Sequence, residues 1–170
     1  MAYLQLDDID LCITKEAKLA VADMVLAWAA LDTMISYWVL LLFGMPMDTG
    51  SILLGNMDTK TKITRLKQFF QHHGNAKEAA LAQRLSKSHE KFVDARNTIA
   101  HRRCFGMQKS DPTRLMFSST KHILGEVGKF EILAIDLSEI RAATKFASDA
   151  EKSIFRLTEP LQGLPQQAGE

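Results

Sequence analysis

The chain has 170 residues and a mass of 19.0 kDa, of which 46% are hydrophobic and 24% are charged. This length and composition are typical of one globular domain and exclude disordered and fibrous proteins. The chain has 21 Lys and Arg and 20 Asp and Glu, and the resulting net charge of +1 excludes a uniformly basic nucleic-acid-binding protein.

The N-terminal residues and the cysteines indicate the cellular compartment of the protein. The N-terminal residues MAYLQLDDID are acidic, whereas a signal peptide would begin with basic residues. The two cysteines, Cys12 and Cys104, cannot form a disulfide framework. We therefore expect a reduced, cytoplasmic protein.

The first predicted element is a long helix that begins near Thr14 and ends before Gly44 and Pro46. Its inner face is predicted from apolar residues at alternating spacings of four and three: Ala17, Val21, Met24, Trp28, Leu31, Ile35, Trp38 and Leu42. Residues 24–43 are apolar enough to suggest a membrane span. However, Asp32 lies near the centre of this stretch, and a central carboxylate is costly in lipid. A buried helix without membrane association is therefore expected.

Three further helices and a short β-rich region follow. The second helix is predicted over about 58–74. The third is predicted over about 75–103, and neither Pro nor Gly occurs anywhere in that stretch. Short β-rich segments then predict two or three strands within about 103–136. The last helix is predicted over about 137–159, and 161–170 form a frayed tail.

This order of elements predicts a mainly α fold. We expect an up-down bundle of four main helices, with a small antiparallel β insertion between the third and the fourth. Residues 1–160 are expected to form a single helical domain, followed by the flexible tail at 161–170.

Charge is distributed unevenly along this sequence. Residues 1–60 hold 3 basic and 8 acidic residues, whereas residues 84–103 hold 6 basic and 2 acidic residues. A nearly neutral protein with one basic stretch can bind a polyanion locally.

The end of the third predicted helix carries the main candidate site. At about 100° per residue, Arg96 falls inside the apolar arc of this helix. A buried guanidinium cannot lose its charge, so it needs an anionic partner or access to a cleft. The opposite side carries a polar stripe, consisting of Glu90, Asp94, Asn97 and His101. A structural role is the alternative, because His and Arg at a helix end also complement the macrodipole.

The segment Arg96-Asn97-Thr98-Ile99-Ala100-His101 resembles the Arg-x4-6-His signature of the HEPN (higher eukaryote and prokaryote nucleotide-binding) superfamily. The polar Asn97 directly after the arginine and the basic continuation Arg102-Arg103 also fit that signature. The resemblance covers the helical scaffold, roughly residues 14–103 and 137–160, and leaves out the β insertion.

This resemblance implies a metal-independent endoribonuclease that acts as a homodimer, with the two motifs facing each other. In that reading His101 is the general acid or base, and Arg96 holds the scissile phosphate. Asn97 orients His101 or binds phosphate, while Arg102 and Arg103 bind flanking phosphates of the RNA. The resemblance further suggests a toxin or a defence effector, with an antitoxin protein as a partner.

Two other functions remain open from the sequence. One is a HEPN-like protein that binds nucleotides or RNA without cleavage, or that forms one half of a toxin–antitoxin pair. The other is a helical interaction protein in which Arg96 is a buried ion-pair partner. No metal is expected, because His72 and His73 lack further ligands at suitable spacing, and no organic cofactor is indicated.

Overall fold

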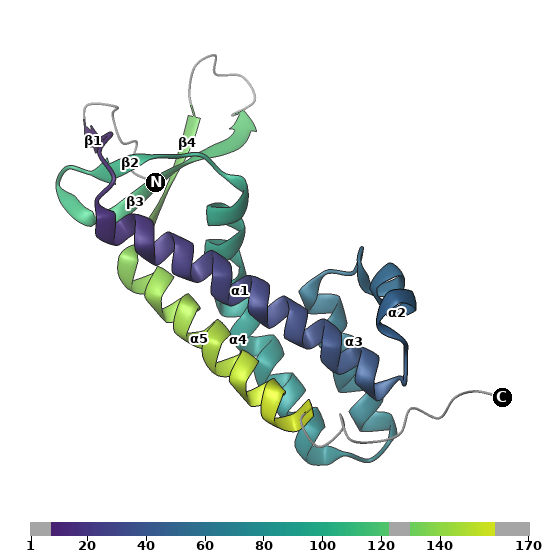
Figure 1. Cartoon of the computed structure of the whole chain (residues 1–170). Helices are drawn as coiled ribbons and strands as arrows, with labels where there is room; N and C mark the ends of the chain where they lie inside the picture. The colour runs from purple at the N-terminus through teal and green to yellow at the C-terminus, as the bar shows by residue number, and fades with distance from the viewer. Residues whose placement is uncertain (1–7, 123–129, 159–170) are drawn as a thin grey trace. The chain divides into compact units, whose positions relative to one another are not determined.

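The computed structural model describes residues 8–122 and 130–158, and within them the protein is mainly helical with a small antiparallel sheet (Figure 1). The helices are α1 (Lys15–Leu42), α2 (Met47–Leu54), α3 (Thr59–His72), α4 (Ala76–His101) and α5 (Leu137–Thr158). The strands are β1 (Ile9–Asp10), β2 (Cys104–Gln108), β3 (Asp111–His122) and β4 (Phe130–Asp136). The expected tail at 161–170 lies outside the described residues.

The mainly α fold and the small antiparallel sheet are confirmed, and the bounds of the four long helices lie close to the predicted ones. Two elements were not predicted. Helix α2 follows the Gly44–Pro46 break, and the short strand β1 adds the N-terminal segment to the sheet. The described part of the chain therefore contains five helices and a four-stranded sheet in the order β1-β2-β3-β4.

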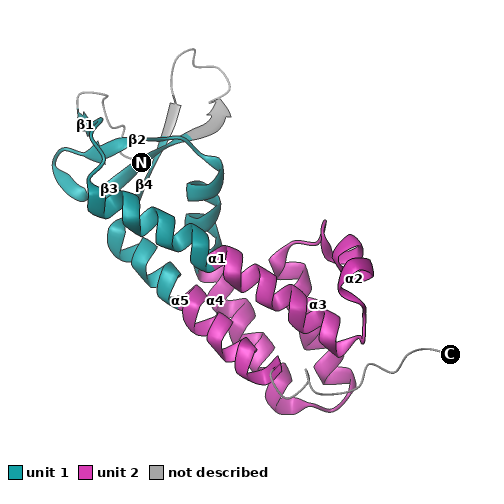
Figure 2. Ribbon diagram, viewed as in Figure 1, with its two compact units in different colours: residues 1–27, 92–145 teal, residues 28–91, 146–170 magenta. Residues whose placement is uncertain are grey.

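The chain divides into two compact units, which are coloured separately in Figure 2. Unit 1 comprises residues 1–27 and 92–145, and unit 2 comprises residues 28–91 and 146–170. Helices α1, α4 and α5 each contribute residues to both units.

Unit 1 is built around the sheet. All neighbouring strands pair antiparallel, and β1 is fixed to β2 by the register Ile9↔Gln108 and Asp10↔Met107. This close pairing requires Gly106, because a Cβ atom there would lie 2.0 Å from the Asp10 carbonyl oxygen. The buried core of this unit comes from both sheet and helices: Ala17, Met24, Ala95, Met107, Leu115, Met116, Phe117, Ile135, Ile140 and Ala143.

Unit 2 is a helical unit with an aromatic core. Trp38 packs against Phe70 with their ring centroids 5.3 Å apart, and Trp28 packs against Phe146 at 5.9 Å. Asp58 caps the N-terminus of α3, since its carboxylate accepts hydrogen bonds from the Thr61 amide and hydroxyl, both at 2.8 Å. These contacts place α3 against α1 in the same unit.

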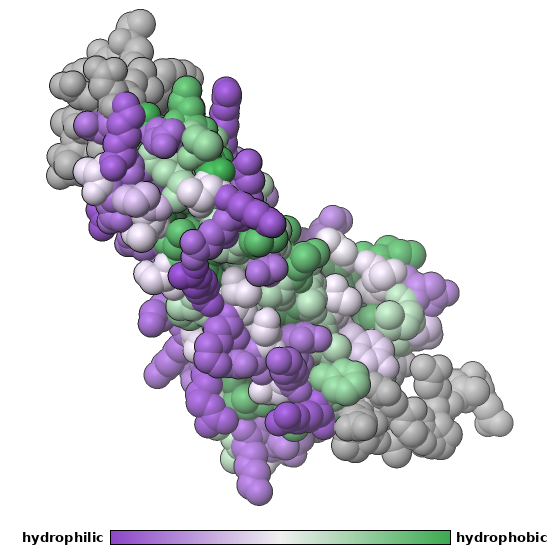
Figure 3. Space-filling view, turned by 60° about the vertical axis from the view of Figure 1, so that its left-hand side comes forward, coloured by the Kyte–Doolittle hydropathy of each residue, from purple (hydrophilic) through white to green (hydrophobic). Residues whose placement is uncertain are grey.

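Helix α1 carries most of its predicted inner face into the core. Of the eight predicted positions, Val21 and Leu42 are half-buried and the other six are buried. By length and composition α1 is also the one helix in the described part of the chain that could cross a membrane, with 33% of its most apolar window buried. Such a helix fits the core of a soluble protein. The outer surface mixes apolar and hydrophilic side chains, as the face drawn in Figure 3 shows.

Candidate functional site

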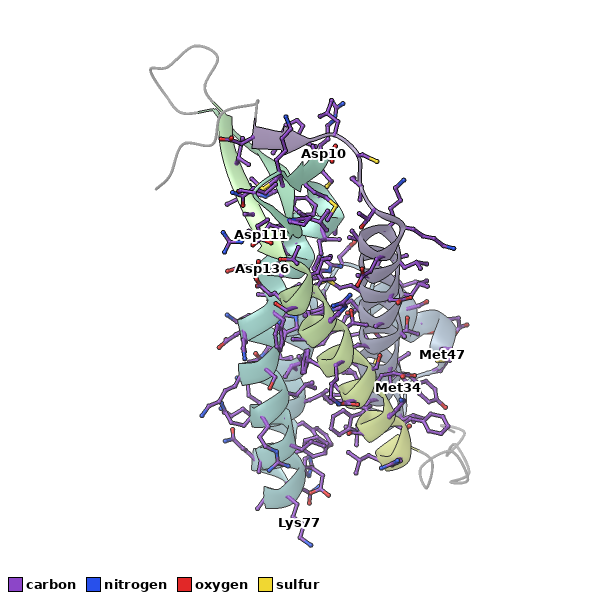
Figure 4. All side chains as sticks on the ribbon, turned by 90° about the vertical axis from the view of Figure 1, so that its left-hand side faces the viewer. Asp10, Met34, Met47, Lys77, Asp111 and Asp136 are labelled. Carbon is purple, nitrogen blue, oxygen red and sulfur yellow. The ribbon has the colours of Figure 1, made fainter. Side chains whose placement is uncertain are left out.

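The candidate site lies in unit 1, where the last turns of α4 meet the outer strand β4. A pocket of about 650 Å³ opens there between the two elements. Its walls carry the polar side chains of Asp94, Asn97, Thr98, His101 and Arg102 from α4 and of Glu139 from α5, and its remaining lining consists of Ala95, Leu133, Ala134 and Ile135. In Figure 4 the label Asp136 marks the point at which β4 passes into α5, next to this lining.

Local helix geometry explains why three of the predicted residues share the pocket. Asn97 and His101 are four residues apart and therefore lie on the same side of α4. Arg102 continues the helical hydrogen bonding, because its amide donates to the Thr98 carbonyl oxygen at 3.0 Å. The predicted polar stripe is exposed along its whole length, so the orientation of this side of the helix was predicted correctly.

Arg96 does not lie where the sequence placed it. It is half-buried rather than enclosed by apolar residues, and it is not part of the pocket lining. Its Nη1 donates to the Asn97 side-chain oxygen at 3.0 Å. In the described part of the chain no carboxylate forms an ion pair with it. Arg96 therefore contacts the pocket only through Asn97.

The reason is a change in the buried face along α4. In the middle of the helix Leu85 and His89 are buried, whereas Ala95 and Thr98 are buried near its end. At 100° per residue, the second pair points about 130° away from the first. A single apolar arc drawn through the whole helix therefore placed Arg96 too far inward.

Arg102 is the most informative member of the site. Its Nη1 atom is buried, and no residue within 8–122 and 130–158 accepts a hydrogen bond from it. Buried guanidinium groups keep their charge and need acceptors. Arg102 also lines an open pocket, and a guanidinium there whose donors are not all paired is suited to bind an anion.

Arg103 points to a different neighbour. Its Cζ atom lies 5.9 Å from the centroid of the Phe105 ring, and it is exposed outside the pocket lining. Its carbonyl oxygen accepts a hydrogen bond from the Ser118 amide at 2.9 Å, which fixes the end of α4 to β3. Of the five predicted residues, the structure therefore brings Asn97, His101 and Arg102 together and leaves Arg96 and Arg103 outside.

Charged groups on the sheet support the β4–α5 corner of the site. Arg114 on β3 pairs with Asp136 at 3.0 Å and with Asp111 at 3.5 Å, and the two carboxylates lie close together in Figure 4. Hydrogen bonding to Asp136 raises the pKa of the Arg114 guanidinium. On β2, burial raises the pKa of the Cys104 thiol, which favours the protonated form.

Sequence reasoning missed the second half of the pocket. Glu139 and the lining residues Leu133, Ala134 and Ile135 are more than 30 positions from the motif. No spacing rule connects them with α4, because the sheet brings them together. Asp94 was recognised as polar, but its place in the pocket was not.

Comparisons of the chain with protein-family models, with curated proteins and with solved structures found no match. Within residues 8–122 and 130–158, no three His, Cys, Asp or Glu side chains are grouped so that they could hold a metal ion. The chemistry available in the pocket is that of an imidazole, a guanidinium, an amide, a hydroxyl and two carboxylates.

Proposed function

We propose that the protein is a HEPN-like, metal-independent endoribonuclease whose active site is the pocket between α4 and β4. The observation that carries the proposal is that Arg102 lines the same pocket as His101, while its buried Nη1 has no hydrogen-bond acceptor among the described residues. An anion-binding group beside an imidazole is what phosphodiester cleavage by the ribose 2′-hydroxyl requires.

Each residue has a defined role in this reaction. The 2′-oxygen attacks phosphorus while His101 takes its proton, and the bond from phosphorus to the 5′-oxygen breaks. The leaving 5′-oxygen takes a proton from water, so the products are a 2′,3′-cyclic phosphate and a 5′-hydroxyl. Arg102 stabilises the charge that develops on the phosphate, and Asn97 orients the substrate beside His101. Arg103 binds a flanking phosphate.

Arg96 enters the proposal through a homodimer. Within one chain it lies outside the pocket, and the hydrogen bond to Asn97 holds its guanidinium at the pocket edge. In a symmetric dimer with facing motifs, Arg96 of one copy holds the phosphate at the His101 pocket of the other. Dimerisation is measured by light scattering at micromolar concentration, and a monomer there contradicts this part of the proposal.

The bundle architecture, the localisation and the partner that we propose follow from the same resemblance. We take α1, α3, α4 and α5 as the four helices of the up-down bundle and β2 to β4 as its insertion. The protein acts in the cytoplasm as a toxin or defence effector, and an antitoxin protein is its expected partner.

Binding without cleavage is the second candidate function. The position of Arg96 favours it, because the motif arginine does not reach the pocket of its own chain. A binding protein would use Arg102 and Asn97 for a nucleotide phosphate without transferring it. The alternative in which Arg96 serves as a buried ion-pair partner gains no support, since the side chain is half-buried and bonded to an amide.

The test is an RNA cleavage assay in excess EDTA, followed by analysis of the product ends. Wild type, His101→Ala and the matched control His72→Ala are compared, since His72 lies at the exposed end of α3. We expect wild type and His72→Ala to leave 2′,3′-cyclic phosphates and His101→Ala to lose about 10²- to 10⁴-fold in rate. Equal cleavage by wild type and His101→Ala would remove His101 from the mechanism. RNA binding without cleavage by wild type would favour the second function.

A further inference from the structure

The pocket of the proposed nuclease has an apolar part that phosphate chemistry does not use. Leu133, Ala134 and Ile135 of β4 form this part, opposite the polar wall of α4. Ala134 is exposed, and Leu133 is half-buried. A planar, weakly polar group can lie against such a surface while a charged group reaches Arg102 on the other side.

The size and lining of the pocket fit a whole nucleotide rather than a phosphate alone. Its volume of about 650 Å³ lies within the range of sites that enclose small organic molecules. A phosphate would occupy only the part near Arg102 and His101. The β4 surface is then left for the flat face of the base, which can pack against aliphatic side chains.

The remaining polar group beside this surface is a carboxylate. Glu139 lies in the first turn of α5, which directly follows β4, and it lines the same pocket as the three β4 residues. It is exposed, and in the described part of the chain it has no ion-pair partner. An ionised carboxylate only accepts hydrogen bonds, and it has two oxygens to do so.

This property distinguishes the four RNA bases by their Watson–Crick edges. Guanine presents two adjacent donors, N1–H and the N2 amino group, which match both oxygens of a carboxylate. In adenine and cytosine the exocyclic amino group lies next to a ring nitrogen that accepts, and in uracil N3–H lies between two carbonyl oxygens. A carboxylate beside the base can therefore accept one hydrogen bond from each of these three edges while it meets a neighbouring acceptor, whereas it accepts two from guanine.

We infer that the pocket is specific for guanine and that Glu139 reads the base through N1–H and the N2 amino group. This inference rests on the proposed function for the position of the nucleotide, with its 3′-phosphate at Arg102. In the proposed reaction the enzyme cuts RNA on the 3′ side of guanosine. Asp94 is the second carboxylate of the pocket. It lies on α4 seven residues before His101, about 10 Å away along the helix axis, and it is not adjacent to β4 in the sequence.

The test measures binding of single nucleotides and needs no cleavage. Guanosine, inosine, adenosine, cytidine and uridine 3′-monophosphates are titrated against wild type by calorimetry in EDTA. Inosine retains N1–H and lacks the N2 amino group. We expect guanosine to bind about tenfold more tightly than inosine, since one hydrogen bond to a charged group is lost, and inosine to bind more tightly than the other three.

Two variants assign the preference to a residue. Glu139→Gln keeps the size of the side chain and replaces one acceptor with a donor, so guanosine should lose about tenfold and the preference should disappear. Asp94→Asn, the matched change on α4, should keep the preference. Equal binding of all five nucleotides by wild type, or no binding of any, overturns the inference even if a variant does not fold. Loss of the preference in Asp94→Asn alone overturns the role of Glu139.

The outcome is separable from that of the proposed function. A protein that binds guanosine 3′-monophosphate selectively but cleaves no RNA retains the base specificity and loses the nuclease activity. A protein that cleaves RNA after all four bases retains the nuclease activity and loses the specificity.

Discussion

Each of the two units contains a cationic side chain with a buried nitrogen, and the two differ in their hydrogen-bond acceptors. In unit 2, Lys62 is 5% exposed, and its Nζ donates to both Asp32 carboxylate oxygens at 3.2 Å and to Ser36 Oγ at 2.9 Å. In unit 1, Arg102 has a buried Nη1 that donates to no described residue. The ammonium of Lys62 therefore has acceptors within the fold, whereas the Nη1 of Arg102 has none among the described residues.

This difference separates a structural charge from a binding group. The Asp32 carboxylate is further supported by a hydrogen bond from Thr59 Oγ1 at 2.7 Å, so the cluster around Lys62 is complete without a ligand. A buried polar group without a partner costs about 1–3 kcal/mol. A protein that retains such a group beside an open pocket gains from it when an anion binds. The cluster around Lys62 therefore stabilises the fold, and Arg102 serves the pocket.

The largest effect is expected from removing the carboxylate partner of Lys62, which tests whether this pair stabilises the fold. Asp32→Ala leaves a buried ammonium with Ser36 as its remaining partner. Because the Asp32 side chain is 43% exposed, we expect a loss of about 2–3 kcal/mol rather than the larger cost of breaking a fully buried pair. Urea unfolding monitored by circular dichroism measures this loss. Asp48→Ala on the exposed start of α2 is the control, and an equal effect of both changes would contradict the structural role.

The next effect concerns the unpaired cation and RNA. Arg102→Ala combined with Arg103→Ala should weaken RNA binding by at least tenfold at low salt. The slope of log K against log salt should fall by about 0.7 for each charge that contacts phosphate. The measurement is fluorescence anisotropy with a labelled single strand over a salt series. Lys77→Ala with Arg84→Ala, at the exposed start of α4, changes the same net charge, and an equal effect there would show that only overall charge matters.

The sequence predicted the long helices well because their ends are encoded locally. Gly44 and Pro46 stop α1, and Asp58 caps α3 with a hydrogen bond to the Thr61 amide. Such signals act within a few residues, so a single sequence is enough to read them. The two-residue strand β1 carries no such signal. It exists because Gly106 lets the backbone at Asp10 approach β2, which is a contact between distant segments.

The site was predicted only as far as it lies on one helix. Asn97, His101 and Arg102 share the pocket because their spacing on α4 is regular. The inward position of Arg96 was predicted wrongly, because α4 changes its buried face between Leu85 and Thr98. Glu139 could not be predicted, because the sheet and the turn into α5 bring it to the pocket.

A smaller effect concerns the start of α3, the helix that carries Lys62. Hydrogen bonds from Thr61 lower the pKa of the Asp58 carboxyl in the folded protein. The stability that this carboxylate contributes is therefore present above its ordinary pKa near 4 and is lost as the pH falls through the lowered value. Asp58→Ala should cost about 1 kcal/mol at pH 7. Asp58→Asn keeps a capping side chain without titrating, so it should be nearly as stable as wild type at pH 7 and lose less stability below pH 4. Urea unfolding over a pH series measures both, and parallel pH profiles of wild type and Asp58→Asn would contradict the assignment.

The smallest expected effect is also the sharpest test of the comparison. Arg102→Met and Lys62→Met both replace a long cation by an apolar side chain of similar length. Lys62→Met removes the partner of Asp32 and should destabilise the protein by about 1 kcal/mol, since the half-exposed carboxylate regains water. Arg102→Met removes a buried donor that no described residue satisfies, so the free energy of unfolding should stay within about 0.5 kcal/mol of wild type. Urea unfolding without ligand measures both changes. Equal destabilisation by the two substitutions would mean that the Arg102 guanidinium holds the fold together, and the anion site would then lose its main support.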